Sequence, residues 1–336
     1  MNILCDRHHA DLWWSLELLA KRLGAKLYCP YGMEWYDQGY FRLYGDLRKQ
    51  DPYRWLAKQY LVDTIYDSYF RESKMGCVDY PKPNLITLDE FKDTPFDIII
   101  CSVHENEPYF AKLKEFQPHA KFMRQVGNDL DTNIDQSLYS NLLASANSPY
   151  EAFSGHKVLY RQEFDLNLFR YQPISQFRNL YTFQNGMEDN EDAWGRWTDL
   201  KHELSEFTFK SYGGGNEDGK FYSKRRFIEA MLESSFIFQT KGQWEGYGHV
   251  VHNAMCLGRP MILKRSDYAG KLAEPLLIKD ETYLEITDPE LIFKIRHYSQ
   301  PVQLRTMSDK ARRLFNEVVD FDQEFIAIRK FFEELV

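Results

Sequence analysis

A glycine-rich stretch followed by an apolar helix and a strand is the part of this sequence best suited to bind a ligand. It reads Glu245-Gly-Tyr-Gly248, continues to Leu257, and ends in Gly258-Arg-Pro-Met-Ile-Leu263. Gly246 and Gly248 leave little side chain where the helix would begin, so backbone N–H groups there can face a ligand. A helix N-terminus offers unpaired donors and a partial positive charge, which suit a phosphate. The pattern predicts a phosphate site, although an ordinary helix–turn–strand unit of an α/β protein has the same pattern.

The far end of this helix is also marked in the sequence. Gly258 suits the position just past a helix end, and Pro260 cannot continue a helix. Met261-Ile-Leu263 is apolar throughout, which is typical of a buried strand. We therefore expect a helix over 249–257 and a strand over 261–263.

The same stretch resembles the nucleotide-sugar signature of retaining glycosyltransferases with the GT-B fold, of the family-four type. In that family an acidic residue opens the loop and contacts the donor sugar, and a second one, eight positions later, holds the ribose. Glu245 matches the first position, whereas Asn253 stands at the second, where an amide carries no charge. The resemblance thus implies that Glu245 bonds the sugar and Asn253 the ribose. It assigns the diphosphate to the backbone of Gly246, Tyr247, Gly248 and His249.

A second segment, about eighty residues earlier, also resembles this family. It consists of an apolar strand at Lys157-Val-Leu-Tyr160, an Asp165-Leu-Asn-Leu-Phe169 turn and a linker with Pro173. It is similar to the segment in which the family crosses between domains. The resemblance implies an α/β protein with the GT-B fold, in which two Rossmann-like domains face each other across a cleft. We expect an acceptor-side domain over 1–172, a nucleotide-sugar domain over 173–310, and a helix over 311–336 that packs back towards the first domain.

The first residues indicate a β-α-β unit, with strands over 2–5 and 26–30 and a helix over 12–23. This arrangement places His8, His9 and Asp11 at the carboxyl edge of a parallel sheet, where ligands bind. The family usually has a Gly-Gly pair in this loop. We expect these three side chains to contact the acceptor or the sugar; a helix cap exposed to solvent is the alternative.

Further strands of the first half are expected over 85–88, 96–101, 120–126 and, as the last, 142–146. His104 follows the second of these strands, and Arg124 and Asn128 lie on and after the third. In related enzymes such loops reach the donor sugar, so His104 is predicted to take part in catalysis, with Arg124 and Asn128 as sugar contacts. A solvated histidine with no such role is equally compatible with the sequence.

The stretch from Tyr31 to Phe70 is dense in aromatic residues, and its Pro52–Tyr66 part is expected to be helical, with Asp51 as N-cap. The loop that starts with Gly32-Met-Glu-Trp35 either covers the acceptor or forms a surface insertion with an aromatic cluster of its own.

In the second half, strands are expected over 180–183, 207–212 and 235–239, and helices over 193–204, 221–232 and 308–335, the last with Ser308 as N-cap. Gly213 and Gly214 follow the second strand, where the family also has glycine. We expect both of them, and Lys210, to contact the nucleotide sugar.

A leaving diphosphate needs cationic side chains near it. The family places an Arg and a Lys after the first strands of the second domain, but this chain reads Gln184-Asn-Gly-Met after Phe183. The remaining candidates are Lys210, Lys241, Arg259, Lys264 and Arg265. We favour Lys241, four residues before Glu245, as a catalytic residue; a solvated loop lysine is the alternative.

The resemblance implies a hexosyl- or pentosyltransferase that acts with retention, without a metal or other cofactor, and in which the leaving phosphate takes the acceptor's proton. The sequence leaves two rivals: a non-catalytic sugar-nucleotide binding protein, and a sugar-nucleotide epimerase or hydrolase on the same fold. A metal held by Glu245, His249 and His252 is a weaker alternative, because the H-E-x-x-H order is lacking. The acceptor is open: a glycan, a lipid-linked sugar, a small metabolite or a hydroxylated nucleobase.

Composition agrees with a soluble, cytoplasmic two-domain protein. The 336 residues are 43% hydrophobic, show no leader and contain no run near the roughly 18 apolar residues of a membrane span. The net charge of −8 provides no general attraction to nucleic acids. The five cysteines lack a C-x-x-C spacing, which indicates reduced, packed thiols.

Overall fold

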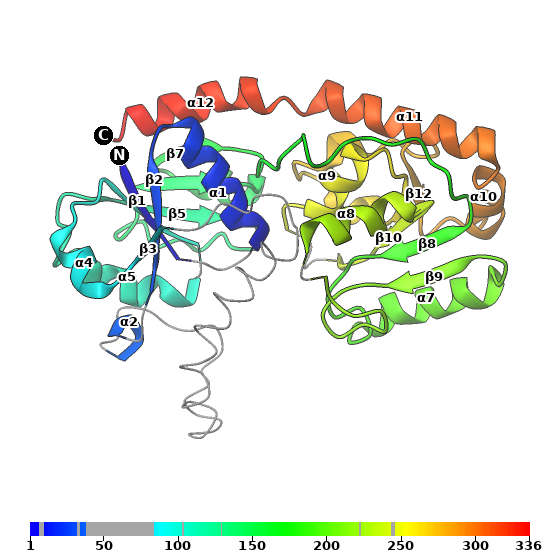
Figure 1. The fold of residues 1–336 in the computed structure, drawn as a ribbon, viewed down its shortest axis with the longest axis horizontal. Coiled ribbons are helices and arrows are strands. Elements are labelled where there is room, and N and C mark those ends of the chain that lie inside the picture. The colour runs from blue at the N-terminus through cyan, green and yellow to red at the C-terminus, as the bar shows by residue number, and fades with distance from the viewer. Residues whose placement is uncertain are drawn as a thin grey trace. The chain divides into compact units, whose positions relative to one another are not determined.

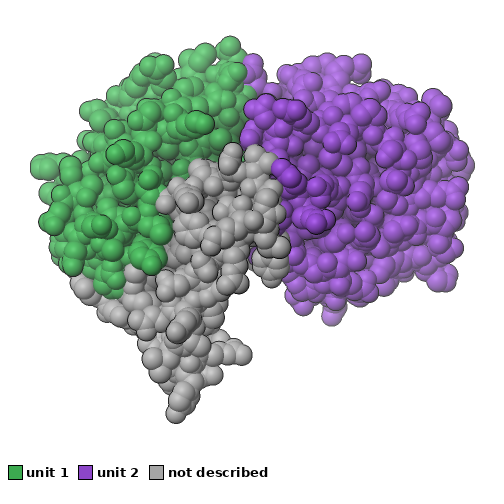
Figure 2. All heavy atoms as spheres, in the orientation of Figure 1, with its two compact units in different colours: residues 1–75, 79–164, 321–336 green, residues 76–78, 165–320 purple. Residues whose placement is uncertain are grey.

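The structure is a computed structural model that describes residues 1–6, 10–31, 34–37, 84–102, 104–128, 130–221, 223–242 and 246–336. The predictions on His8, His9, Glu245 and the helix over 52–66 lie outside the described residues. The chain divides into two compact units (Figure 2). Unit 1 comprises residues 1–75, 79–164 and 321–336, and unit 2 comprises residues 76–78 and 165–320.

Within its described residues, unit 1 is built on a seven-stranded parallel sheet with the order β3-β2-β1-β4-β5-β6-β7 (Figure 1). Its strands are β1 (Asn2–Cys5), β2 (Lys26–Pro30), β3 (Asn84–Ile86), β4 (Ile98–Cys101), β5 (Lys121–Val126), β6 (Asn141–Ala144) and β7 (His156–Leu159). Its helices are α1 (Ala10–Arg22), α2 (Glu34–Asp37), α4 (Leu88–Asp93), η1 (His104–Asn106), α5 (Glu107–Leu113), α6 (Asn147–Ala152) and α12 (Phe321–Glu333). Every residue of β4 and β6 is buried, as expected for central strands of a parallel sheet.

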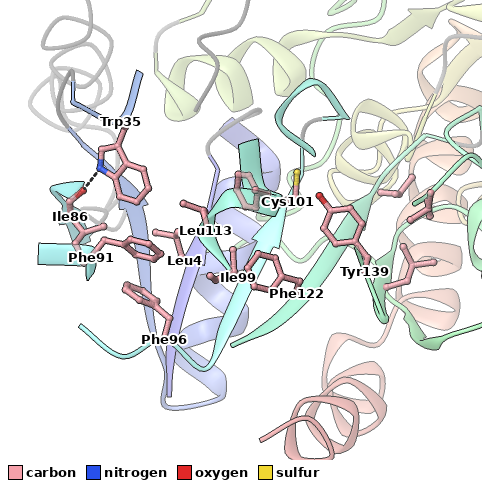
Figure 3. Close-up of a cluster of buried hydrophobic side chains, with 14 of the residues drawn as sticks. Leu4, Trp35, Ile86, Phe91, Phe96, Ile99, Cys101, Leu113, Phe122 and Tyr139 are labelled. Carbon is pink, nitrogen blue, oxygen red and sulfur yellow. Dashed lines mark hydrogen bonds between the residues drawn. The ribbon is translucent and has the colours of Figure 1, made fainter. Parts of the chain in front are cut away.

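A row of aromatic and aliphatic side chains forms the core of unit 1 on one face of this sheet (Figure 3). Trp35 is fully buried there, packs against Phe91 with ring centroids 5.0 Å apart, and donates its indole N–H to the Ile86 carbonyl at 3.0 Å. This bond ties α2 to the end of β3. Trp35 is therefore a core residue of unit 1, whereas most of the loop that starts at Gly32 lies outside the described residues.

Unit 2 is built on a second parallel sheet, five-stranded in the described residues, with the order β12-β11-β10-β8-β9 (Figure 1). Its strands are β8 (Asn179–Thr182), β9 (Thr208–Ser211), β10 (Phe236–Gln239), β11 (Met261–Leu263) and β12 (Tyr283–Glu285). Its helices are α7 (Glu191–Glu203), α8 (Lys224–Glu233), α9 (His249–Cys256), η3 (Arg265–Tyr268), η4 (Glu274–Leu276), α10 (Leu291–Tyr298) and α11 (Pro301–Val318). The predicted fold class, α/β with two parallel sheets, is confirmed.

Three predicted boundaries are wrong for identifiable reasons. The strand expected over 85–88 ends at Ile86, because Thr87 forms a capping box with Glu90 and starts α4. Ser308 is not an N-cap but a buried residue inside α11, which begins at Pro301, a residue suited to a first helical turn. The strand over 142–146 is not the last of its sheet, because β7 pairs with it in parallel.

Helix α12 comes last in the sequence but belongs to unit 1. Arg22 of α1 forms ion pairs with Asp322 at 2.6 Å and with Glu163 at 2.8 Å, and Arg161 pairs with Glu324. Phe321, at the start of α12, is buried. Salt bridges thus fix one side of a helix whose apolar side joins the core of unit 1.

Within the described residues, no helix has the length and apolarity needed to cross a bilayer. Four cysteines are described (Cys5, Cys29, Cys101 and Cys256), and all four are buried free thiols, as predicted.

Glu17 on α1 gives unit 1 a pH dependence. Burial raises the pKa of Glu17 to about 7, and the Trp13 side chain offsets part of this. Because the pKa in the fold lies above that of an unfolded chain, the fold favours the protonated acid and loses stability as the pH rises through 7. Replacing Glu17 by glutamine, which mimics the acid, is expected to add about 1–2 kcal/mol at pH 8.5 and little at pH 4.

Urea unfolding of both proteins at the two pH values measures this difference. The matched control is Glu151→Gln, at an exposed residue of α6 in the same unit, which should change the stability equally little at both. An equal effect of Glu17→Gln at pH 4 and pH 8.5 would contradict the assignment.

Candidate functional site

The strand order of unit 2 locates its ligand-binding edge. The chain runs from β8 outward to β9 and then returns to the other side of β8 to form β10. The loops after β8 and β10 therefore leave the sheet in opposite directions, and such a switch point is where open α/β sheets bind ligands. A pocket of about 680 Å³ lies here, lined by Gln184, Asn185, Gly186, Asp189, Asn190, Glu191, Asp192 and Lys241. We call it the switch-point pocket.

The loop after β9 contacts and stabilises one wall of this pocket. Asn216 donates its side-chain amide to the Gln184 carbonyl at 2.7 Å and accepts the Met187 N–H at 3.2 Å. Gly213 has a φ of 142°, and a Cβ there would lie 2.6 Å from the Gln184 carbonyl oxygen. Gly214 donates its N–H to the side chain of Asn185 at 2.8 Å. Both glycines predicted to contact the sugar donor thus touch the wall of the pocket, and neither lines it.

Gln184 stands at the buried end of the pocket and was missed as a site residue in the sequence. It is only 2% exposed, and its Oε1 accepts the backbone N–H of Thr240, just after β10, at 3.0 Å. Since an N–H can only be donated to the oxygen, this bond fixes which end of the carboxamide is Nε2. Among the described residues Nε2 has no acceptor. A glutamine after a strand gives no sign of this role in the sequence alone.

The charges of the pocket are mainly negative. Asp189, Glu191 and Asp192 are exposed, and none of them forms an ion pair with a described residue. Two of them lie in the first turn of α7, where they already compensate its helix dipole. Lys241 is the one basic side chain among the residues that line the pocket, and its catalytic role stays a prediction.

Helix α9 starts from the same loop as Lys241. Its N-cap is Gly248, with a left-handed φ of 80°, no side-chain cap and no acidic residue in the first turn. A Cβ on Gly248 would lie 3.2 Å from the Cβ of Ala273, so glycine suits both the conformation and the space. A helix N-terminus without an acidic residue in its first turn suits an anion.

Aromatic and imidazole rings hold the loop before α9. Tyr247 stacks on His252, with ring centroids 4.4 Å apart, and His249 meets its edge at 4.8 Å. His252 Nδ1 lies 3.0 Å from the Gly248 carbonyl. No cluster of three metal-binding side chains occurs among the described residues, which do not include Glu245 of the metal alternative.

Asn253 lies in the second turn of α9 and is 3% exposed. Its Oδ1 is buried and has no hydrogen-bond partner among the described residues. An unsatisfied buried carbonyl is costly unless a ligand or water donates a hydrogen bond to it, and the contact to a ribose hydroxyl stays a prediction.

Most of the other basic candidates lie elsewhere. Lys210 lies over the rings of Tyr181 and Tyr212, at 5.3 and 5.9 Å, and the hydrogen bond that it donates to Tyr212 raises its pKa. Arg259 is buried before the amino end of β11, at the edge of the sheet opposite to the pocket. Arg265 pairs with Glu274 at 3.2 Å.

Unit 1 gathers polar side chains at its own switch point, between β1 and β4. Asp6 is buried, and its Oδ1 accepts both the N–H and the hydroxyl of Ser102 at 2.6 Å, while Oδ2 accepts from Asn106 at 3.1 Å. The sequence placed this loop at the edge of the sheet but did not single out Asp6. It holds the two loops together.

The predicted residues His104 and Arg124 are linked through Glu107. The carboxylate of Glu107 lies 3.3 Å from His104 Nδ1 and 3.0 Å from Arg124 Nε. Burial raises the pKa of Glu107, and the Arg124 guanidinium offsets part of this. The His104 side chain is 63% exposed and accessible, whereas Arg124 is buried and also bonds Asp131 at 2.6 Å. Arg124 thus holds protein groups together.

The structure also describes the other two residues of unit 1 that were predicted to contact the sugar. Asn128 accepts the Leu130 N–H at 3.1 Å in the loop after β5, and Asp11 is half-buried in the first turn of α1.

No protein-family model and no curated protein matches this sequence. Several solved structures, in contrast, are similar to this chain. HepE from Anabaena in complex with UDP-glucose superposes with a TM-score of 0.60 at 13% identity, over 99% of this chain and 100% of that one.

Two further structures are similar. A sucrose-phosphate synthase from Thermosynechococcus elongatus gives a TM-score of 0.58 at 11% identity, over 100% of this chain and 99% of that one. AviGT4, a glycosyltransferase involved in avilamycin A biosynthesis, gives 0.55 at 8% identity, over 100% and 98%. Taken with the two parallel sheets, these likenesses show that this chain has the GT-B fold.

Proposed function

We propose that this protein is a glycosyltransferase that moves a hexosyl group from a nucleotide sugar to an acceptor. The observation that supports the proposal most directly is the switch-point pocket of unit 2. A buried amide and a lysine line it, and α9 starts, without a side-chain cap, from the same loop as the lysine. The solved structure of HepE, which has the same fold, contains UDP-glucose, and UDP-glucose is therefore the first donor to test.

In this proposal different residues bind different parts of the nucleotide sugar. The backbone N–H groups of Gly246 to His249 and the ammonium of Lys241 bind the diphosphate and stabilise the charge that develops as it leaves. The open Oδ1 of Asn253 accepts a ribose hydroxyl. The family resemblance adds Glu245 as the contact to the donor sugar.

The reaction needs no separate general base in the mechanism implied by the resemblance. The acceptor hydroxyl attacks the anomeric carbon on the face from which the diphosphate departs, the C–O bond to phosphate breaks, and the phosphate oxygen takes the hydroxyl proton. The sugar keeps its configuration. We propose His104, the accessible side chain of the Glu107 cluster, as a contact to the sugar from unit 1.

A non-catalytic sugar-nucleotide binding protein is the second candidate. The observation that favours it is the lining of the pocket, in which three carboxylates accompany a single lysine. Less positive charge near the diphosphate means less stabilisation of the leaving group.

A thermal-shift screen against nucleoside diphosphates and their sugars tests the proposal. A ligand at about 100 times its dissociation constant adds roughly 2.7 kcal/mol, which raises the melting temperature measurably. Asn253→Ala is expected to weaken the affinity for the bound nucleotide several-fold, because it removes the ribose contact. Unchanged affinity would contradict that role.

Turnover separates the two candidates. A transferase cleaves the sugar donor only when an acceptor is present, whereas a hydrolase does not need one and a binding protein does not turn over. Binding without turnover, tested over glycan, lipid-linked, small-molecule and nucleobase acceptors, would favour the binding protein. Failure of every nucleotide to bind would contradict both.

A further inference from the structure

The switch-point pocket has two chemically different parts. Gln184 and Lys241 each lie two residues past the end of a strand, β8 and β10, that borders the switch point. Asp189, Glu191 and Asp192 follow further along the chain, at the exposed start of α7. The pocket therefore has hydrogen-bond donors at the strand ends and carboxylates along its rim.

The carboxamide of Gln184 has a hydrogen-bond donor that lacks an acceptor in the part of the chain that the structure describes. The side chain is almost fully buried, its oxygen is occupied by the Thr240 N–H, and its Nε2 has no acceptor among the described residues. A ligand oxygen can accept a hydrogen bond from this N–H group. A phosphate oxygen is such an acceptor, and the Lys241 ammonium stands in the same lining.

The carboxylates of the rim prefer hydrogen-bond donors, whereas Gln184 Nε2 and Lys241 prefer acceptors. Carboxylates accept hydrogen bonds from hydroxyl groups but repel other anions. Three carboxylates against one ammonium leave the lining with an excess of negative charge, and no described basic residue forms an ion pair with any of the three. A neutral sugar with several hydroxyls is compatible with this rim, whereas a sugar that carries a carboxylate is not.

We propose that the switch-point pocket selects sugar donors by charge: it binds a nucleotide-linked neutral hexose and rejects the corresponding uronic acid. Gln184 Nε2 and Lys241 contact the phosphate, and the carboxylates of Asp189 and Asp192 accept sugar hydroxyls. This inference rests on the proposed function, since it requires that a nucleotide sugar occupies the pocket.

The test compares two donors that differ in a single group. The nucleotide is first identified among the diphosphates of uridine, guanosine, adenosine and thymidine. Isothermal titration then measures the affinities of its neutral hexose form and of the matching uronic acid at low salt. We expect the uronic acid to bind at least about tenfold more weakly, because its carboxylate comes within a few ångströms of the rim. At 0.5 M salt the ratio should fall, since the Debye length is then only about 4 Å.

Charge-neutralising variants identify the residues responsible. Asp189→Asn and Asp192→Asn should each reduce the ratio between the two donors about threefold. The matched control is Asp199→Asn, which removes the same charge from an exposed position of α7 about two turns beyond Asp192, outside the pocket lining. It should leave the ratio unchanged.

The outcomes are distinct. If no nucleoside diphosphate binds, the proposed function fails and this inference with it. If the nucleotide binds but both sugar forms bind equally well, only the inference is overturned. A ratio that is insensitive to salt, or that persists in both aspartate variants, would also overturn the assignment to the rim. The salt dependence is measured on the unaltered protein, so the test does not depend on how the variants fold.

Discussion

Replacing Arg259 by methionine is expected to lower the free energy of unfolding by about 4 kcal/mol. The guanidinium is 1% exposed and donates to the carbonyls of Leu232, Gln172, Leu257 and Gly258 at 2.9–3.3 Å. Leu232 lies in the last turn of α8 and Leu257 is the C-cap of α9, so one side chain satisfies the ends of two helices. Each buried carbonyl left without a donor costs about 1–3 kcal/mol.

Arg259 stays charged although it is buried. Burial lowers the pKa of Arg259 to about 10, and the nearby Tyr171 offsets part of the effect, so the group stays protonated at neutral pH. No carboxylate pairs with it among the described residues. Methionine keeps the volume and removes the charge, which isolates the loss of the hydrogen bonds.

Urea unfolding measures the effect, and two variants complete the test. Arg259→Lys keeps the charge but not the fork of five donors, and should lose most of the same stability. Arg313→Met, at an exposed residue of α11, removes a cation with an expected loss below about 0.5 kcal/mol. A loss below about 1 kcal/mol for Arg259→Met would show that the carbonyls find other donors.

Replacing Gln184 by glutamate is expected to weaken nucleotide binding about 100-fold. The two side chains have the same shape, and glutamate can still accept the Thr240 N–H that now bonds Gln184 at 3.0 Å. Only the Nε2 donor is exchanged for a negative oxygen. A hydrogen bond to a charged group is worth about 1.5–3 kcal/mol, and repulsion between the new carboxylate and a phosphate adds to the loss.

Titration of the nucleoside diphosphate into both proteins measures this effect. Asn185→Asp is the matched control, because it adds the same charge to an exposed residue of the same lining while keeping the oxygen that accepts the Gly214 N–H. We expect a loss below about fivefold for this variant, owing to solvent screening. Equal losses in both variants would mean that charge alone, and not the Nε2 donor, governs binding.

Strands and their order along the chain were predictable from apolar runs. The runs at 2–5, 96–101, 235–239 and 261–263 all form strands at or within these limits, because a buried parallel strand has no polar face to obscure the pattern. Boundaries set by local hydrogen bonds were harder. Thr87 looks like a strand residue until its side chain is seen to cap α4.

One short strand escaped prediction. Strand β12, Tyr283–Glu285, has only three residues and gives no periodic signal.

At the site, backbone positions were more predictable than side-chain roles. Gly258 has a φ of 65°, as its predicted place after α9 requires. The contact of Lys210 with the Tyr181 ring and that of Arg259 with the Leu232 carbonyl join residues 29 and 27 positions apart. A list of candidate cations taken from the sequence does not contain these contacts. The sequence does not reveal the bond that orients Gln184 either.

The division of the chain has a consequence for how the protein is made. Unit 2 takes its described strands and helices from residues 165–320, whereas unit 1 also needs α12 from the end of the sequence. During synthesis, unit 2 can complete its core before residues 321–333 have left the ribosome, because domains fold as units when their segments emerge. Until then Phe164 lacks its contact with Phe321, and Arg161 lacks Glu324. The unit that is translated first is therefore the last to be completed, and its uncovered surface is open to chaperones in the meantime.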